Sequence, residues 1–130
     1  MIEQETLTDP AEILDAAASY MEIHGKCRGS YEDVDGRVCA SGAIRRVCGY
    51  HNRDEQFEEM RQSLGEAEAY LETRRRWALV ARAEEQFAEW RHQRPGYYAS
   101  GEIINWSDTN AEETVVGGLR AAARYARGQA

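Results

Sequence analysis

Two pairs of potential metal ligands lie on either side of a glycine-rich stretch. His24 and Cys27 are separated by two residues, and Cys48 and His51 repeat this spacing in reverse order. Two thiolates and two imidazoles suit a tetrahedral zinc ion. Unpaired cysteines, however, are among the most buried residue types in proteins. We therefore expect buried thiols with no bound metal or cofactor, and we keep a zinc-stabilised module as an alternative.

The third cysteine, Cys39, stands directly before a segment with helical spacing. A thiol at the beginning of a helix can have a lowered pKa and act as a nucleophile. Such a nucleophile also needs a base and an oxyanion site, and the spacing of His24 and His51 fixes neither. The sequence therefore favours a core cysteine in a protein that is not an enzyme.

A locally positive segment indicates a different kind of site. Residues 24–53 carry six bases and three acids within an acidic chain. This balance is compatible with an anionic metabolite or nucleotide as ligand. The residues expected to surround that ligand are Arg37, Arg45, Trp106 and Asp108. The competing interpretation is a solvated loop, with Asp108 as a turn residue.

Aromatic residues in the second half of the chain indicate a candidate surface for a protein partner. They are Trp77, Phe87, Trp90, Tyr97 and Tyr98. At helical spacing such residues usually belong to a core. Exposed aromatics beside arginines, in contrast, anchor protein interfaces. The residues expected to bind a partner are Arg74, Arg75, Trp77 and Trp90.

The first helix that positions these residues has clear ends. Asp9 and Glu12 have the spacing of a capping box, and Pro10 suits the first helical turn. Apolar residues then recur at helical spacing as far as Met21, and Gly25 favours a left-handed stop. The sequence therefore predicts a helix between Asp9 and Gly25.

The joint that follows, residues 26–39, is too rich in glycine and turn residues for a helix. The pair Asp35-Gly36 predicts a tight turn, so residues 28–31 and 37–39 are expected to form a short β-hairpin or an irregular ribbon. Helical spacing returns over residues 39–47.

The middle of the chain predicts one long amphipathic helix over residues 53–94, with Asn52 and Glu55 as the signal for its N-terminus. Its first half has a rhythm typical of a coiled-coil seam, which favours a homodimer: Phe57, Met60, Leu64, Ala67 and Leu71. Residues 72–76 interrupt the apolar face. A helical hairpin that turns near residues 72–76 is the alternative.

The C-terminal part predicts a loop or extended segment over residues 97–104 and a last helix capped by Asn110 and ended by Gly128. Gly117 and Gly118 lie inside that helix, where each costs about 1 kcal/mol relative to alanine. A close neighbour packed against them would explain their presence.

Composition excludes several classes of protein. The formal net charge of −7 over 130 residues argues against general nucleic-acid binding, which depends on cationic contacts to phosphate. No segment approaches the ~20 apolar residues that span a bilayer, and the acidic beginning is unlike a signal peptide. We therefore expect a cytoplasmic protein with one domain over residues 1–130 and no membrane contact.

Several short motifs follow one another along the chain: Gly25-Lys26-Cys27-Arg28-Gly29, Asp35-Gly36, Cys39-Ala40-Ser41-Gly42-Ala43-Ile44, Trp106-Ser107-Asp108 and Ala111-Glu112-Glu113-Thr114-Val115. Their order resembles an uncharacterised family, a domain of unknown function found in actinobacteria and their phages. The resemblance covers both ends of the chain and leaves out residues 53–94. Lys26 stands where the family tends to have tryptophan, and Ser107 where it tends to have asparagine. The resemblance implies a mostly helical fold and no particular activity.

The expected fold is mainly α: a compact domain of four to five helices with one long amphipathic helix and a short irregular or β-hairpin joint at 26–39. The leading functional hypothesis is a non-enzymatic accessory protein, actinobacterial or phage-encoded, that binds another protein, for example one of the host. The small-ligand binder and the zinc-stabilised module are the alternatives.

Overall fold

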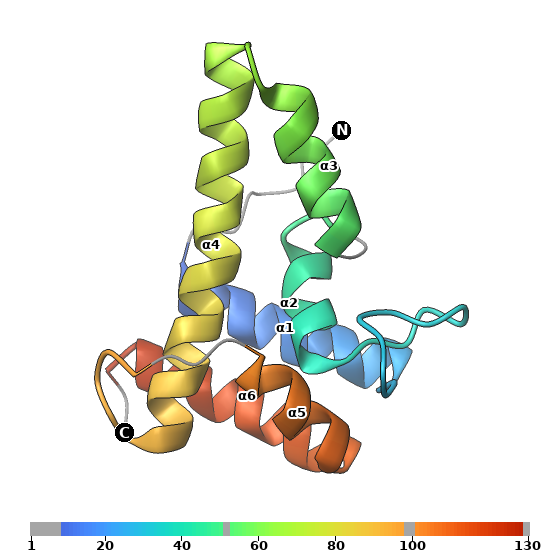
Figure 1. The fold of residues 1–130 in the computed structure, drawn as a ribbon. Coiled ribbons are helices and arrows are strands. Elements are labelled where there is room, and N and C mark those ends of the chain that lie inside the picture. The colour runs from blue at the N-terminus through green and yellow to red at the C-terminus, as the bar shows by residue number, and fades with distance from the viewer. Residues whose placement is uncertain (1–8, 51–52, 98–100, 129–130) are drawn as a thin grey trace, which may run out of the picture.

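The computed structural model describes residues 9–50, 53–97 and 101–128, and these residues form six helices and no strand (Figure 1). The helices are α1 (Pro10–His24), α2 (Ala40–Val47), α3 (Arg53–Ser63), α4 (Ala67–His92), α5 (Glu102–Thr109) and α6 (Glu112–Ala126). The mainly α class is confirmed. The expected number of helices is too low, because residues 53–94 contain two helices and residues 102–109 form another. None of the described helices is long and apolar enough to cross a membrane.

The predicted ends of α1 are confirmed. The Asp9 carboxylate accepts a hydrogen bond from the Ala11 amide at 3.0 Å, and Pro10 occupies the first turn. At the other end, Gly25 has a φ of 94° and its amide donates to the Met21 carbonyl at 2.7 Å. Only glycine adopts such a φ without strain. The chain therefore leaves α1 sharply and enters the joint.

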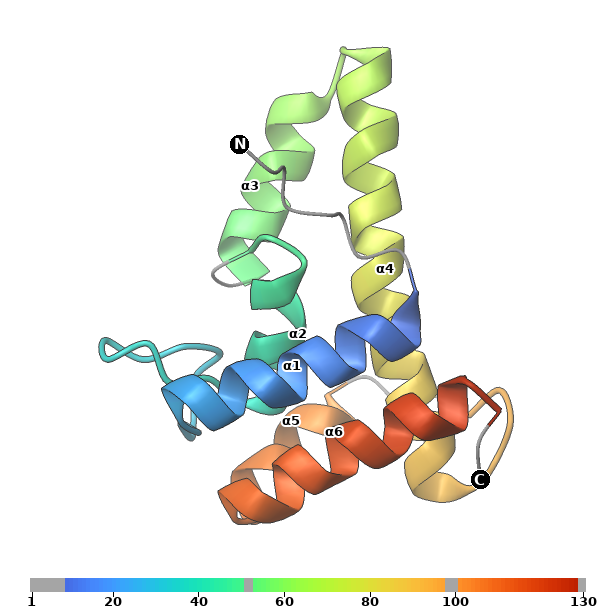
Figure 2. The ribbon, with the colours of Figure 1, turned by 180° about the vertical axis from the view of Figure 1, so that it is seen from behind.

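The body of the molecule consists of α1, α2, α5, α6 and the C-terminal part of α4 (Figures 1 and 2). Helices α1 and α6 lie side by side and bury many small residues against each other, among them Ala17, Ala18, Ala122 and Ala123. Larger side chains fill the space toward α4, including Ile13 and Phe87. Small residues let the helix backbones approach closely, as interiors packed at crystal-like density require.

The joint is irregular, which is one of the two predicted forms, and residues 37–39 pair with residues 31–33 and not with the predicted 28–31. Lys26 and Val38 form an isolated parallel bridge, and Glu32 and Val38 an antiparallel one. The Cys39 amide donates to the Tyr31 carbonyl at 3.1 Å. The Asp33 amide also donates to the Arg37 carbonyl at 2.9 Å, so residues 31–33 and 37–39 pair briefly around the turn at Gly36 without forming regular strands.

A close approach at Gly42 locks the joint onto α2. A Cβ atom at this position would lie 1.8 Å from the Tyr31 carbonyl oxygen. No real Cβ contact is so short, and the obstacle is backbone, which cannot swing aside. Glycine at residue 42 is therefore required for this close approach.

Helix α3 and the first part of α4, residues 53–79, form an arm that stands off the body (Figure 1). The single helix predicted over residues 53–94 is wrong, and the alternative of a helical hairpin is confirmed, although its turn does not lie near residues 72–76. The chain turns at Gly65, which has a φ of 90°. The seam proposed for Phe57 to Leu71 therefore spans two helices and is not one continuous stripe.

The arm contributes no fully buried apolar residue to the core within its described part. Buried apolar side chains are found up to Tyr50 and again from Val80 onward. Partly exposed contacts join the two arm helices: Trp77 packs against Phe57, Thr73 donates to the Glu59 carboxylate at 3.1 Å, and the Trp77 indole donates to the Gln56 carbonyl at 3.3 Å.

Helix α5 occupies residues that the sequence pattern predicted to be partly a loop. It begins after Gly101, and its C-terminal residue Asn110 donates a side-chain hydrogen bond to the Trp106 carbonyl at 2.8 Å. Asn110 therefore ends α5, and Ala111 precedes α6. Part of the predicted loop, residues 98–100, lies outside the described residues, as does Asn52.

The two glycines of α6 differ in what surrounds them, which gives a matched pair of substitutions. A Cβ on Gly118 would lie 2.5 Å from Cη2 of Trp106, whereas a Cβ on Gly117 would meet nothing within 4 Å. We expect Gly118→Ala to lower the free energy of unfolding by about 1–3 kcal/mol, because it overpacks the contact with Trp106.

Gly117→Ala is the control, and we expect it to raise stability by up to about 1 kcal/mol, through helix propensity. Urea unfolding followed by circular dichroism measures both values. A Gly118→Ala variant as stable as Gly117→Ala would contradict the packing described here.

Candidate functional site

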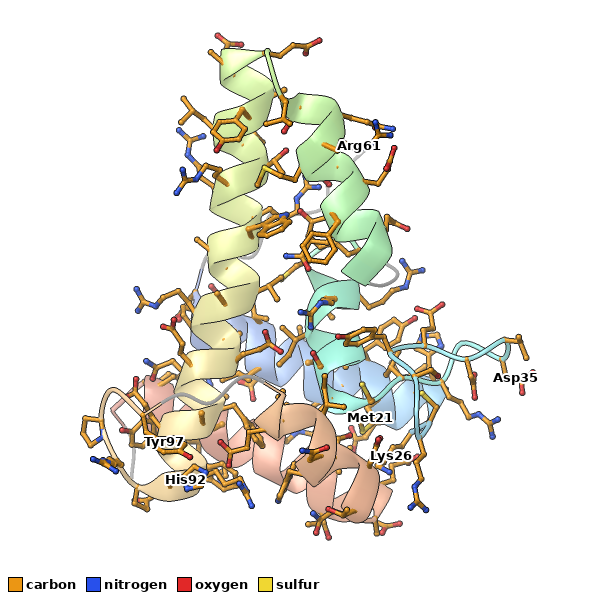
Figure 3. The ribbon with its side chains drawn as sticks, viewed as in Figure 1. Met21, Lys26, Asp35, Arg61, His92 and Tyr97 are labelled. Atoms are coloured by element: carbon orange, nitrogen blue, oxygen red, sulfur yellow. The ribbon has the colours of Figure 1, made fainter. Side chains whose placement is uncertain are left out.

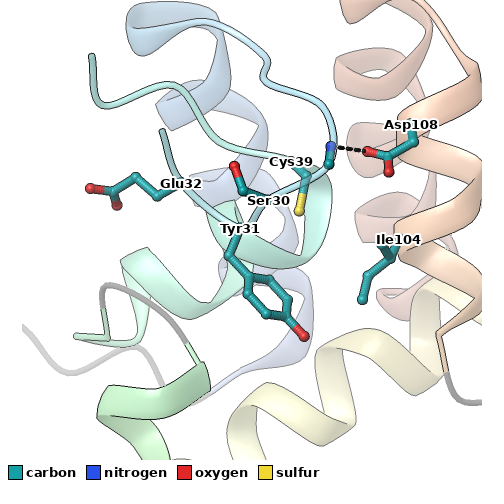
Figure 4. Close-up of a pocket in the computed structure, with 7 residues that line it drawn as sticks. Ser30, Tyr31, Glu32, Cys39, Ile104 and Asp108 are labelled. Atoms are coloured by element: carbon teal, nitrogen blue, oxygen red, sulfur yellow. Dashed lines mark hydrogen bonds between the residues drawn. The ribbon is translucent and has the colours of Figure 1, made fainter. Parts of the chain in front are cut away.

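A pocket of about 410 Å³ lies between the joint and α5 (Figure 4). It is lined by Gly29, Ser30, Tyr31, Glu32, Cys39, Ile104 and Asp108. In Figure 4 the Tyr31 side chain extends toward Ile104, and Glu32 points away from Asp108. The pocket is therefore an open hollow between the joint and one helix, segments that are far apart in the sequence.

Two hydrogen bonds fix α5 against this loop and α2. The Asp108 carboxylate accepts from the Gly29 amide at 3.3 Å, and the Ser107 hydroxyl accepts from the Ala40 amide at 2.9 Å. Ser107 is fully buried and Asp108 is half-buried. Neighbouring residues of one segment thus have different tasks: Ser107 fastens α5 to α2, and Asp108 faces the pocket.

The four residues expected to surround an anionic ligand lie in different surroundings. Asp108 lines the pocket together with Cys39. Arg37 pairs with Asp33 at 2.7 Å, in the part of the joint near Asp35 that projects from the body (Figure 3). Asp33 holds the pKa of the Arg37 guanidinium above its ordinary value. Arg37 is therefore engaged by acids of its own loop.

Trp106 belongs to an aromatic cluster in the body. Its ring centroid lies 4.9 Å from that of Phe87 and 6.5 Å from that of Trp90. The same indole packs against Gly118. Trp106 and Trp90 are thus packing residues that hold α4, α5 and α6 together.

Arg45 lies in a buried polar network between α2, α3 and α4. Its side chain pairs with Glu84 at 3.4 Å, and each of these two side chains has an exposed fraction of 10%. Its Nε donates to the Gln56 side chain at 3.2 Å, and Nη1 also donates to the Ser41 hydroxyl. The guanidinium lies 5.0 Å from the centroid of the Tyr31 ring. Arg45 therefore links the arm, the body and the joint.

The surroundings of the three cysteines are those of structural thiols. Burial raises the pKa of Cys39 to about 11 and that of Cys48 to about 12. Burial also raises the pKa of Cys27, whose sulfur donates to the Ser30 carbonyl at 3.3 Å. Cys39 caps α2 by accepting from the Gly42 amide at 3.3 Å. Its position at the beginning of a helix therefore gives no activated thiolate, because desolvation is the larger effect.

The described residues contain no group of three or more potential ligands that could hold a metal ion. His24 stacks on Tyr20, with ring centroids 4.1 Å apart. Cys27 lies in the joint, and Cys48 lies at the end of α2. The fourth candidate ligand, His51, falls outside the described residues.

The predicted partner-binding residues divide between surface and interior. Arg74 and Arg75 are exposed on the arm, whereas Trp77 is half-buried against Phe57, with ring centroids 5.3 Å apart. The largest exposed apolar side chains of the arm are Phe57, Leu64 and Leu71, with exposed fractions of 46%, 61% and 53%. The apolar spacing in the sequence included these three residues, but it predicted that they pack in a coiled-coil seam, whereas they are exposed.

One comparison with known proteins gives a match. A protein-family model described as "Family of unknown function (DUF6197)" matches residues 5–125. This range includes residues 53–94, which the motif resemblance had left out. No curated protein and no solved structure matches the chain.

Breaking the Arg45 network tests its importance for stability. We expect Arg45→Ala to lower the free energy of unfolding by about 3–5 kcal/mol, because Glu84 would remain buried with the Ser41 hydroxyl but without its cationic partner. Arg75→Ala removes an exposed pair with Glu72 and is the control, with an expected change below about 1 kcal/mol. Denaturant unfolding measures both, and equal effects would argue against a structural role for Arg45.

Thiol labelling tests the environment of the cysteines. The pKa values of Cys39 and Cys48 in the folded chain lie above the ordinary thiol value of 9.0, so folding favours the protonated form of both thiols. At pH 8 we expect iodoacetamide to label native Cys39 on the order of a hundredfold more slowly than the urea-unfolded chain, since only the thiolate reacts. Mass spectrometry of timed samples measures the rates. Equal rates in the native and unfolded chains would contradict a buried thiol.

Proposed function

The chain belongs to the family of unknown function DUF6197, and we propose that it is a non-enzymatic accessory protein that acts by binding another protein through its arm. The observation that carries this proposal is the combination of shape and composition in residues 53–79. The arm projects from the body, and it exposes Phe57, Leu64 and Leu71. Contiguous exposed apolar patches mark interaction surfaces, and in this proposal the three residues belong to one such patch.

The internal packing of the arm supports the same proposal. Its two helices are joined by Glu59, Thr73 and Arg76, with Arg76 donating to the Glu59 carboxylate at 2.8 Å. The apolar contact between them is that of Phe57 with Trp77, and Phe57 is 46% exposed. A pair of helices with so little buried apolar surface gains little stability from its own packing. A partner that covers Leu64 and Leu71 would supply the missing apolar contact.

The charge of the arm indicates the chemistry of this partner. Residues 54–73 carry seven acids and one base. A surface with the opposite charge would be attracted and oriented by this excess. Two arms packed on each other would instead bring acids against acids. We therefore assign the arm to a different protein with a basic, partly apolar face, in preference to a second copy of this chain.

The setting of this activity is part of the proposal. We place the protein in the cytoplasm of an actinobacterium, or of the host cell if a phage encodes it. The raised pKa values of the three thiols support a role without covalent catalysis.

Substitution of the exposed leucines tests the arm as a binding surface. We expect the wild-type chain, immobilised and exposed to a lysate of its source organism, to retain a partner that a Leu64→Ser, Leu71→Ser double variant loses. The partner should also dissociate as the salt concentration rises, because screening weakens the attraction to the acidic arm. Quantitative mass spectrometry measures the retained protein.

The control is Ile23→Ser, which removes a side chain with an exposed fraction of 78% outside the arm. It should retain the partner at the wild-type level. Light scattering after size exclusion measures the mass of the free chain. A dimer dissociated by the double variant would replace the proposed partner with a second copy, and equal retention by all variants would overturn the role of the arm.

A further inference from the structure

The pocket between the joint and α5 has the size of a small-molecule site. Its volume of about 410 Å³ lies within the ~300–1,000 Å³ that such sites occupy. It is separate from the arm, and no part of the proposed protein-binding surface lines it. Its walls are fixed by the contacts described above: Gly42 under the Tyr31 carbonyl and Ser107 on the Ala40 amide.

Apolar and polar groups are arranged on different sides of this pocket. Ile104 and the Tyr31 ring provide apolar surface, and in Figure 4 they lie on opposite sides of the pocket. Asp108 lies on α5 above them. One of its oxygens accepts from the Gly29 amide, which leaves the second oxygen for another donor. In small-molecule sites a small number of well-placed polar groups orients the ligand, and Asp108 can do so here for a ligand whose apolar part contacts Tyr31 and Ile104.

The charge of the lining favours a cation. None of the lining residues is lysine, arginine or histidine, whereas Asp108 and Glu32 are acids. Arg46 pairs with Glu32 at 3.6 Å, so the charge of Glu32 is matched by a base outside the lining. Arg45 lies 5.0 Å from the centroid of the Tyr31 ring and is engaged by Glu84 and Gln56. The preference for a cation therefore depends on Asp108. A carboxylate at the edge of an apolar pocket attracts an opposite charge more strongly than it would in bulk water.

We infer that this pocket binds a small organic cation, an ammonium or guanidinium group carried on an apolar body. The cation lies at the Asp108 carboxylate, and the apolar body lies between Tyr31 and Ile104. This ligand has the opposite charge to the one that the basic residues of 24–53 had indicated, because those bases do not line the pocket. The inference does not depend on the function of the arm.

A set of three probes with the same ring tests the charge preference. Benzylammonium, benzyl alcohol and benzoate are titrated separately into the full-length protein, and amide chemical shifts are followed by NMR. We expect benzylammonium to shift the amides of Gly29, Tyr31 and Asp108, and to bind at least about tenfold more tightly than benzyl alcohol. Benzoate should bind most weakly.

Asp108→Asn identifies the residue responsible. Asparagine keeps an oxygen that accepts from the Gly29 amide, so the loop should stay in place, which the same spectra report. The variant should bind benzylammonium no better than benzyl alcohol, and its affinity for the alcohol should be unchanged. Glu113→Gln removes an exposed acid of α6 that does not line the pocket, and it should bind all three probes as the wild type does.

Three outcomes would overturn the inference. The first is that benzoate binds as tightly as benzylammonium. The second is that the shifted amides lie away from the pocket, and the third is that benzylammonium does not bind. Any one of these outcomes rules out the cation site. Because the probes are small molecules, such a failure leaves the partner experiment on the arm unaffected.

Discussion

The buried guanidinium of Arg45 is the interaction on which the rest of the structure depends. It lies where α2, α3 and α4 meet, and it binds one polar group from each neighbour: Glu84 from α4, Gln56 from α3 and Ser41 from its own helix. A buried charge is stable only when it is paired and its donors are used. The direction in which the arm leaves the body is therefore set by the geometry of one side chain, which also supports the Tyr31 ring of the joint.

Local signals in the sequence predicted the ends of α1 and the need for a neighbour at Gly118, because a cap and a missing side chain act through atoms close by. The turn at Gly65 escaped prediction for a physical reason. The apolar rhythm from Phe57 to Leu71 continues across it, although the two helices run in different directions. Periodicity describes one face of a helix and contains no information on where that helix ends. The signal available in the sequence was the glycine itself, because glycine is the residue type that adopts a positive φ without strain.

The candidate site was predictable only in part. Asp108 was expected near residues 37–45, and it does line a pocket with Cys39. Arg45 and Trp106 were expected beside it, but each is held by contacts with other helices. Charge counted along a segment cannot distinguish a base that faces solvent from one that neutralises a buried acid. Glu84, which engages Arg45, comes from α4 and lies 39 residues further along the chain.

The small amount of apolar surface buried in the arm also affects which parts of the molecule open locally. Hydrogen exchange of backbone amides follows the free energy needed to open each cooperative unit, and units with few buried apolar contacts open first. The α3–α4 turn and the helical ends next to it can open without exposing the core around Phe87 and Leu119. Amides near Gly65 should thus exchange through local opening, whereas those of α1 and α6 should exchange only when the whole molecule unfolds. The molecule accordingly behaves as two units of unequal stability within one continuous chain.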